Sequence, residues 1–418
     1  MLEHSTGLNL PATLQHAVDR GDPVITQAIS YQAAVAEFYG VRDLVAVTNA
    51  HFTGDFEVMD IGGMEYLQSL VDMGATLAIP TTRNSTCLNA NFTEFLCQAS
   101  SLVEGELEVT SLLRKLGVIP VNTCIGYQTV YQPTHGEHVA WGDTGAVTYA
   151  NSVLGARSNF EAGPASLYAG ITGYTPNYGY HLDQNRRGNI MCRLNCILDD
   201  VADWGVLGAL IGSAYRGYWN VPVIELGPAH PTPDALKHLA AALTSYGSIP
   251  MFHIVGLTPE APTVEDAVRG RSIIGDHQIF IDDIIAFYSQ YSISTAKPDL
   301  VVFTAPQLSL MELGQIVRLL RGRRIQPDVN LIVTTNSMIA AAAADMGLIN
   351  ALTQAGGKLI TGTCWYLMDP ARTARERGWT TVLTNSAKLA NIIKAHGYRP
   401  ILRRTASCIE AAITGLLS

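Results

Sequence analysis

The residues best suited to chemistry lie in and just before residues 141–157. This stretch combines glycines with short polar side chains, one carboxylate and one arginine, and Cys124 precedes it. Glycine lets the backbone approach a ligand closely, and Asp, Asn, Ser and Thr supply short donors and acceptors. Burying such groups is costly unless something pairs with them. The stretch therefore predicts a ligand site, and a turn-rich structural loop is the alternative.

Two of the seven cysteines follow strand-like segments. Cys124 comes after residues 118–121, and Cys364 comes after residues 358–360. Cysteines that are far apart in sequence can converge on an iron–sulfur cluster. Cys192 and Cys196 would share a face if their segment were helical, but no further Cys or His lies nearby. We therefore expect those two to pack in the core.

Lys388 and Arg157 are the candidates for binding an anion. Ser386 precedes a helical segment, so a carboxylate or phosphate could lie at free backbone N–H groups there, with Lys388 as countercharge. Arg157 could hold a carboxylate through two parallel hydrogen bonds. For either residue, an ordinary surface ion pair is the alternative.

Among the histidines, His51 and His253 lie in or just after strand-like runs. A single histidine is more often a hydrogen-bonded structural group than a catalyst, but the loop that follows His253 favours a functional role. The sequence contains no GxxxxGK[ST], GxGxxG or GxSxG pattern. Nucleotide hydrolysis, hydride transfer and the usual serine hydrolysis are therefore disfavoured.

Alternating strands and helices must position these residues, and this alternation predicts an α/β fold with parallel sheets. Ligands bind beyond the carboxyl ends of such strands, although Ser, Thr and Asn there also serve as helix caps. Ser309, with Glu312 three residues later, predicts a capping box. The strand-like segments that run into polar residues are 44–47, 75–79, 300–303, 331–333, 358–360 and 381–383.

The composition is that of an ordinary globular protein. The chain has 418 residues, 48% of them apolar, and a net charge of -9, so it can bury a large core and offers no basic stripe for nucleic acid or an anionic membrane. No apolar run approaches the roughly 18 residues that span a bilayer. The N-terminus lacks a signal-peptide pattern. An odd number of cysteines favours a reducing compartment, so we expect a cytoplasmic protein with no nucleic-acid or membrane partner.

Glycine and aromatic residues at 216–221 predict a boundary between two α/β regions, residues 1–217 and 218–418. Taken together, the motifs resemble the large subunit of the aconitase X family, a branch of the aconitase superfamily. The resemblance implies an aconitase-like multi-domain architecture with parallel sheets flanked by helices. The matching segments span nearly the whole chain in order: residues 80–84, 122–124, 151–157, 253–262, 363–364 and 384–388.

Proteins of this family remove water from a hydroxylated acid such as cis-3-hydroxy-L-proline or mevalonate 5-phosphate, with an iron–sulfur cluster held by three cysteines. The resemblance makes Cys124 and Cys364 the first and third ligands. The second should lie at residues 304–307, where Ala305 cannot ligate iron. A two-cysteine cluster, a different metal arrangement and no metal at all are then the alternatives. Residues 125–127 and 143–145 also depart from the family pattern, which indicates altered chemistry on a retained scaffold. The family's small swivelling domain has no counterpart in this chain, so we expect a separate small subunit.

The leading hypothesis is a hydro-lyase that acts on a small hydroxylated carboxylic acid, in which a Lewis-acidic metal draws off the hydroxyl and a base removes the adjacent proton. The candidate catalytic residues are Asp143, Thr144 and His253. Two alternatives remain: a cluster-free isomerase or lyase on the same scaffold, and a non-catalytic subunit that binds a small acid. The candidate substrate-binding residues are Asn151, Ser152, Arg157, Thr258, Asn385, Ser386 and Lys388.

Overall fold

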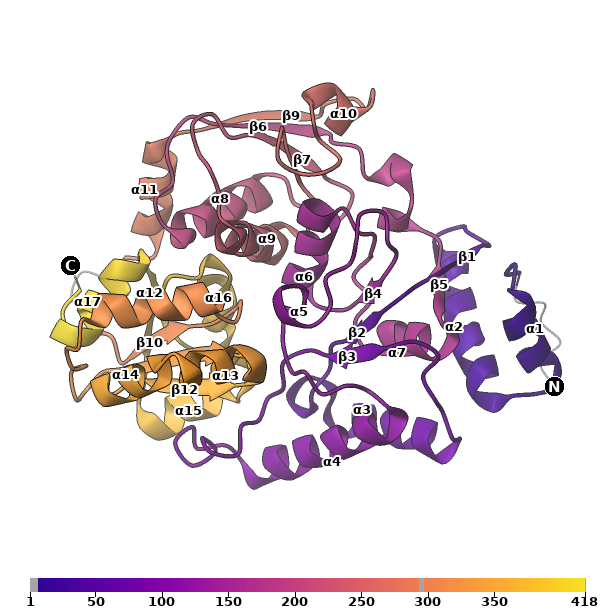
Figure 1. The fold of residues 1–418 in the computed structure, drawn as a ribbon, viewed down its shortest axis with the longest axis horizontal. Coiled ribbons are helices and arrows are strands. Elements are labelled where there is room, and N and C mark those ends of the chain that lie inside the picture. The colour runs from indigo at the N-terminus through magenta and orange to yellow at the C-terminus, as the bar shows by residue number, and fades with distance from the viewer. Residues whose placement is uncertain (1–6, 293–296, 418) are drawn as a thin grey trace.

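The computed structural model describes residues 7–292 and 297–417, which form three α/β regions around a common centre (Figure 1). Three of the four sheets in this part of the chain are parallel, as the alternation of strands and helices predicts. The fourth sheet is a short antiparallel pair. No helix within the described ranges is both long and apolar enough to cross a membrane.

The first region contains a three-stranded sheet in the order β3-β2-β4. The strands predicted at residues 75–79 and 118–121 are wrong. The first of these segments bonds to helices instead of a strand: Ala75 N–H donates to the Leu70 carbonyl at 3.0 Å and Ala78 N–H donates to the Gly170 carbonyl at 2.8 Å. The second forms a single bridge. The elements of this region are α1 (Ala12–Asp19), α2 (Pro23–Phe38), β1 (Leu44–Ala46), β2 (Ala50–Phe52), α3 (Phe56–Asp72), β3 (Thr81–Arg83), α4 (Ser100–Leu116), α5 (Gly126–Thr129), β4 (Ala140–Trp141), α6 (Thr144–Tyr149), a π-helical turn (Ala150–Leu154), α7 (Pro164–Thr172) and β5 (Tyr174–Pro176).

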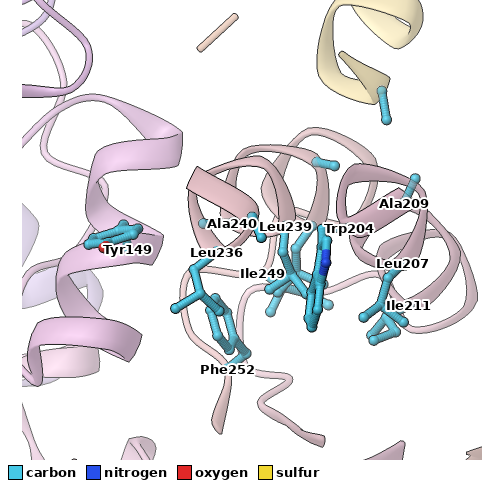
Figure 2. Close-up of a cluster of buried hydrophobic side chains, with 14 of the residues drawn as sticks. Tyr149, Trp204, Leu207, Ala209, Ile211, Leu236, Leu239, Ala240, Ile249 and Phe252 are labelled. Carbon is cyan, nitrogen blue, oxygen red and sulfur yellow. The ribbon is translucent and has the colours of Figure 1, made fainter. Parts of the chain in front are cut away.

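The second region has a four-stranded sheet in the order β8-β7-β6-β9. Its two long helices pack closely because Gly208 allows contact, and Figure 2 shows Trp204 and Leu239 in the buried cluster between them. Cys192 lies in a strand rather than a helix. The elements are β6 (Ile190–Leu194), α8 (Val201–Ala214), β7 (Pro222–Glu225), α9 (Pro233–Gly247), β8 (His253–Ile254), α10 (Val264–Val268), β9 (Gly275–Ile279) and α11 (Ile281–Gln290).

The boundary expected between residues 217 and 218 falls inside this second region. Strand β6 precedes that position and β7 follows it, yet the two strands pair in parallel. The glycine and aromatic residues at 216–221 therefore form the connection from α8 to β7.

The third region is a five-stranded parallel sheet in the order β12-β11-β10-β13-β14. The capping box of Ser309 and Glu312 is confirmed at the start of α12. The elements are β10 (Leu300–Phe303), α12 (Leu310–Leu320), β11 (Asn330–Thr335), α13 (Ser337–Asp345), α14 (Leu348–Ala355), β12 (Lys358–Thr361), α15 (Pro370–Arg377), β13 (Thr381–Thr384), α16 (Ala387–Ile392), β14 (Arg399–Leu402) and α17 (Thr405–Thr414).

The carboxyl ends of the first and third sheets meet at the centre of the molecule. The loop after β3 joins the loop after β12, because Thr86 N–H donates to the Gly362 carbonyl at 2.9 Å. Polar residues that follow strands of both sheets are thereby gathered in one place, where parallel sheets ordinarily bind ligands.

Candidate functional site

Cys124 and Cys364, far apart in the sequence, meet at this centre. Their Sγ atoms are 3.7 Å apart, and the Ser85 hydroxyl lies 3.4 Å from the sulfur of Cys364. The hydrogen bonds with Cys124 and Ser85 lower the pKa of the Cys364 thiol against the effect of burial. The contact with Cys364 and burial raise the pKa of Cys124. The structure thus brings together the two cysteines that the sequence singled out.

The side chain of Gln307 lies beside the two sulfurs and is completely buried. Its Nε2 donates to two loop carbonyls, at 3.0 and 3.3 Å, and to the Ser85 hydroxyl at 3.3 Å. Its Oε1 accepts from the Thr123 hydroxyl at 2.8 Å, and its backbone N–H donates to the Cys124 sulfur at 3.3 Å. Gln307 is therefore a structural member of this site.

The residues present do not fit a cluster held by three thiolates. Ala305, at the position that the resemblance gives to the second ligand, lies in an apolar cluster with Trp365 and Leu389. Within residues 7–292 and 297–417, no three His, Cys, Asp or Glu side chains are grouped to hold a metal. The cluster implied by the resemblance thus lacks one of its thiolate donors here.

A carboxylate and a histidine lie buried near the sulfur pair. Asp143 follows β4 and caps α6, with Oδ1 accepting from Ala146 N–H at 2.9 Å and Oδ2 accepting from the Asn84 amide at 3.2 Å. His51 in β2 is fixed by the Thr82 hydroxyl, 2.8 Å from its Nδ1, and its Nε2 has no partner among the described residues. Burial lowers the pKa of His51 to about 4, although Asp143 acts to raise it. The Thr123 backbone and the Asn84 side chain also act to raise this pKa. At neutral pH, His51 is therefore an uncharged imidazole whose Nε2 forms no hydrogen bond with the described residues.

Lys388 brings a positive charge to the same site. Its Nζ donates to the Thr144 hydroxyl at 3.2 Å and lies 6.0 Å from the centre of the Tyr366 ring. It is one of the groups that lower the pKa of Cys364. Among the described residues, this nearly buried ammonium pairs with a neutral hydroxyl rather than with a carboxylate, which leaves its charge available to an anionic ligand.

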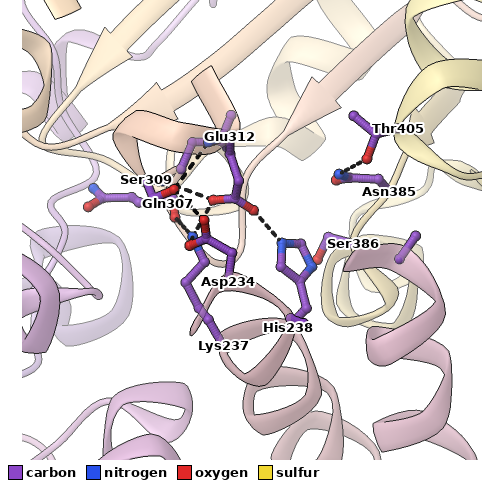
Figure 3. Close-up of polar contacts among 12 residues, drawn as sticks. Asp234, Lys237, His238, Gln307, Ser309, Glu312, Asn385, Ser386 and Thr405 are labelled. Atoms are coloured by element: carbon purple, nitrogen blue, oxygen red, sulfur yellow. Dashed lines mark hydrogen bonds and ion pairs between the residues drawn. The ribbon is translucent and has the colours of Figure 1, made fainter. Parts of the chain in front are cut away.

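Asn385 and Ser386 follow β13, and both direct their side chains into the protein (Figure 3). The Asn385 amide donates to the Thr405 hydroxyl at 3.0 Å. The Ser386 hydroxyl donates to the Ala305 carbonyl at 2.6 Å and also caps α16. These two residues fix the start of α16, the helix that carries Lys388.

The other predicted site residues belong to a second polar network, around the buried guanidinium of Arg186. This guanidinium pairs with Glu260 at 2.5 Å and donates to the Asn151 carbonyl at 2.8 Å. His253 Nε2 lies 2.7 Å from the Arg186 carbonyl, and the charged groups that affect its pKa belong to this network. The structure therefore does not place His253 or Asn151 with the cysteines.

Ser152, Thr258 and Arg157 bind backbone groups, and Arg157 also forms a surface ion pair. The sequence had left such an ion pair open as the alternative role of Arg157. Ser152 accepts from Phe252 N–H at 2.8 Å, Thr258 accepts from Ile254 N–H at 2.9 Å, and Arg157 donates to the His181 carbonyl at 2.8 Å and pairs with Asp183.

Sequence reasoning missed Asn84, Ser85 and Gln307 as site residues and gave His51 no role. Asn84 and Ser85 directly follow β3, and Gln307 follows β10 by four positions. The signal that could have found these three residues is a run of polar residues after a parallel strand, the same signal that identified Cys364 and Lys388. The wrong strand at residues 75–79 hid it for β3, because that interpretation placed the strand end at Pro80.

A buried ion cluster holds the loop that carries Gln307 (Figure 3). Lys237 of α9 donates to the Gln307 carbonyl at 3.0 Å and pairs with Glu312 of α12, and His238 lies 2.8 Å from the same carboxylate. Burial acts to raise the pKa of Glu312, but Lys237 and His238 outweigh it and lower the pKa to about 2. The ionised cluster joins the second region to the third beside the site.

Comparison with known proteins agrees with this arrangement. The family models for the first, second and third domains of aconitase X match residues 14–184, 188–288 and 298–414. The phosphomevalonate dehydratase large subunit of Methanothermobacter thermautotrophicus is 32% identical over 371 residues, which cover 88% of this chain and 89% of that protein. The cis-3-hydroxy-L-proline dehydratase of Pseudomonas aeruginosa is 31% identical over 391 residues, which cover 91% of this chain and 66% of that protein.

Among solved structures, the holo-form of Thermococcus kodakaraensis aconitase X superposes with a TM-score of 0.86 at 28% identity. The match covers 97% of this chain and 100% of that one. Sequence and structure thus agree over nearly the full described length, and the chain belongs to the aconitase X family.

Proposed function

We propose that the chain is the large subunit of a dehydratase that removes water from a small hydroxylated carboxylic acid. Relatives of similar length are named phosphomevalonate dehydratase large subunits, and others are named cis-3-hydroxy-L-proline dehydratases. The observation that carries the proposal is the buried grouping of Asp143, His51 and Lys388 beside the cysteine pair.

Dehydration of a hydroxy acid requires a cation for the carboxylate and a group that moves a proton. In this proposal, Lys388 binds the carboxylate, with Thr144 orienting its ammonium. Asp143 lies where its charge stabilises a protonated His51. Both groups are buried, and electrostatic interactions are stronger where water is excluded.

The free Nε2 of His51 is the proton acceptor. Thr82 donates to the Ala50 carbonyl at 3.3 Å, so its oxygen can accept from Nδ1–H of His51, which leaves the lone pair on Nε2. This nitrogen takes the proton next to the substrate carboxylate. The imidazolium, held by Asp143, then returns that proton to the leaving hydroxyl, and water departs as the double bond forms.

In family members with a full ligand set, an iron centre would supply Lewis acidity for the leaving hydroxyl. This chain does not offer three thiolates among its described residues, so the proton transfer relies on His51 and Asp143. Some roles predicted from the sequence stay predictions: the catalytic role of His253 and the substrate-binding roles of Asn151, Ser152, Arg157, Thr258, Asn385 and Ser386. The hydrogen bonds that these residues form within the protein argue against direct contact with substrate.

The active enzyme includes a second, smaller polypeptide that completes the site. The name "large subunit" of several relatives supports this, as does the length of the hydroxyproline dehydratase, which extends well beyond the matched part. The cytoplasmic location expected from the cysteine content stays a prediction.

The test is an assay of the chain together with any small polypeptide that co-purifies with it. Phosphomevalonate and cis-3-hydroxy-L-proline serve as probes, and NMR follows the loss of water. Lys388→Ala should lower kcat/KM about 100-fold, because it removes the partner of the substrate carboxylate. Arg157→Ala, the matched control, removes a cation outside the site and should change kcat/KM by less than about threefold. Equal effects of the two variants would refute this site assignment.

A further inference from the structure

The Gln307 side chain hydrogen-bonds to several polar groups around the cysteine pair. From the loop after β10, it contacts the loops after β3 and β12 and the segment before α5. Both of its polar atoms are used and the side chain has no exposure. A buried amide without partners would be costly, so these bonds stabilise the observed arrangement.

Gln307 is connected to both sulfurs, to Cys124 directly and to Cys364 through Ser85. Its backbone N–H donates to Cys124 Sγ at 3.3 Å. Its Nε2 donates to the Ser85 hydroxyl, which in turn contacts Cys364 Sγ at 3.4 Å. Hydrogen bonds of this kind hold the two thiols in direct contact at 3.7 Å.

Ala305, at the position that the resemblance gives to the second ligand, offers no donor atom in its side chain. Its backbone has a φ of 54°, its carbonyl accepts from the Ser386 hydroxyl, and its methyl group packs with Trp365. We propose that Gln307, through its backbone N–H at Cys124 and its side-chain amide at Ser85, replaces an iron–sulfur cluster as the group that links Cys124 to Cys364, so that no cluster assembles on this chain.

Metal analysis tests the proposal without any substrate, so its outcome is independent of the proposed reaction. The chain with its co-purifying polypeptide is purified without oxygen and incubated with ferrous iron and sulfide, and iron, acid-labile sulfide, visible absorption and electron paramagnetic resonance are measured. A ferredoxin treated in parallel confirms the procedure. We expect no stoichiometric iron or sulfide. Stoichiometric iron that disappears in Cys124→Ser, with or without sulfide, would overturn the proposal.

Thiol labelling tests the linking role of Gln307 directly. Gln307→Ala should increase the alkylation rates of Cys124 and Cys364 at least about tenfold relative to the buried Cys408, because it removes the side-chain bonds that hold the loops around the pair together. Gln32→Ala is the matched control, since the buried Gln32 of α2 donates to the Thr172 hydroxyl at 3.0 Å and to the Tyr174 carbonyl at 2.6 Å, in another part of the fold. Labelling of the pair should stay unchanged there. Unchanged labelling in Gln307→Ala, or an equal increase in the control, would overturn the linking role.

Discussion

At the scale of single residues, Asp143 has a structural role and a proposed catalytic role, and one substitution can separate them. Its carboxylate caps α6 and also faces His51. Asn is as good an N-cap as Asp, so Asp143→Asn should keep the fold while removing the charge that holds the imidazolium. We expect kcat/KM to fall between about 100- and 10,000-fold, with unchanged circular dichroism. Asp143→Ala should also lose stability, by about 1 kcal/mol. An active Asp143→Asn enzyme would show that the Asp143 carboxylate takes no part in the reaction.

His51 should stay uncharged throughout the neutral range. Burial lowers its pKa to about 4, so its ring resonances in NMR should show no titration between pH 8 and pH 5. The ring resonances of the exposed His230 serve as the internal reference. Charging of His51 above pH 6 would contradict its role as a neutral proton acceptor.

The sequence predicted only part of the site at this scale. Cys364 and Lys388 were found because they follow the parallel strands β12 and β13, and sheet topology places such residues together. Cys124 was found although the segment before it, residues 118–121, forms only a single bridge. The buried pairing of Arg186 with Glu260 joins distant segments, and no local pattern reveals it. For that reason, His253 and Asn151 looked like site residues although their hydrogen bonds serve this pairing.

At the scale of elements, close helix packing should be sensitive to single methyl groups. A Cβ at Gly208 of α8 would lie 2.4 Å from the Leu239 carbonyl oxygen of α9. Gly208→Ala should therefore destabilise the protein by about 1–3 kcal/mol, despite the better helix propensity of alanine. Gly314 of α12 has its nearest neighbour atom at 3.5 Å, so Gly314→Ala should be neutral or stabilise by up to about 1 kcal/mol. Urea unfolding compares the two variants. Equal changes would contradict this packing argument.

The order of elements was largely predictable from the sequence, because hydrophobic periodicity and strand-end polar residues are local signals. The capping box at Ser309 and strands β10, β11, β12 and β13 of the third region follow from such signals, whereas β14 was not predicted. The strands assigned at residues 75–79 and 118–121 were wrong, since a short apolar run does not reveal whether a partner strand lies beside it. Cys192 shows the same ambiguity between helix and strand.

At the scale of the whole molecule, the Lys237–Glu312 pair joins two regions and should control stability. Glu312→Gln leaves Lys237 without its main partner, so the free energy of unfolding should fall by about 3–5 kcal/mol at neutral pH. The folded-state pKa of about 2 lies below the ordinary 4.5, so the contribution of ionised Glu312 is complete above pH 4.5 and is lost as the pH falls toward 2. The difference between wild type and variant should shrink over that window.

A surface pair provides the control for this prediction. Glu410 pairs with Arg323 and both side chains are substantially exposed. Glu410→Gln should change the free energy of unfolding by less than about 1 kcal/mol. A similar loss in both variants, or a loss in Glu312→Gln that is independent of pH, would contradict the assigned role of the buried cluster.

The meeting of two sheets at one site was predictable only through the resemblance to a known family. Periodicity indicates each sheet, but the contact between the loops after β3 and β12 depends on tertiary packing. The replacement of a cysteine by Ala305 was visible in the sequence, whereas the linking role of Gln307 required the structure.

The central claim is that Asp143, His51 and Lys388 carry out dehydration of a small hydroxy acid. The most direct measurement is NMR of the chain and its co-purifying polypeptide, incubated with phosphomevalonate and, separately, cis-3-hydroxy-L-proline. We expect loss of one water from one of these probes, at a rate lowered at least about 100-fold by Asp143→Asn and by Lys388→Ala but retained in Arg157→Ala. Binding of both probes without loss of water, or undiminished turnover in Asp143→Asn, would contradict it.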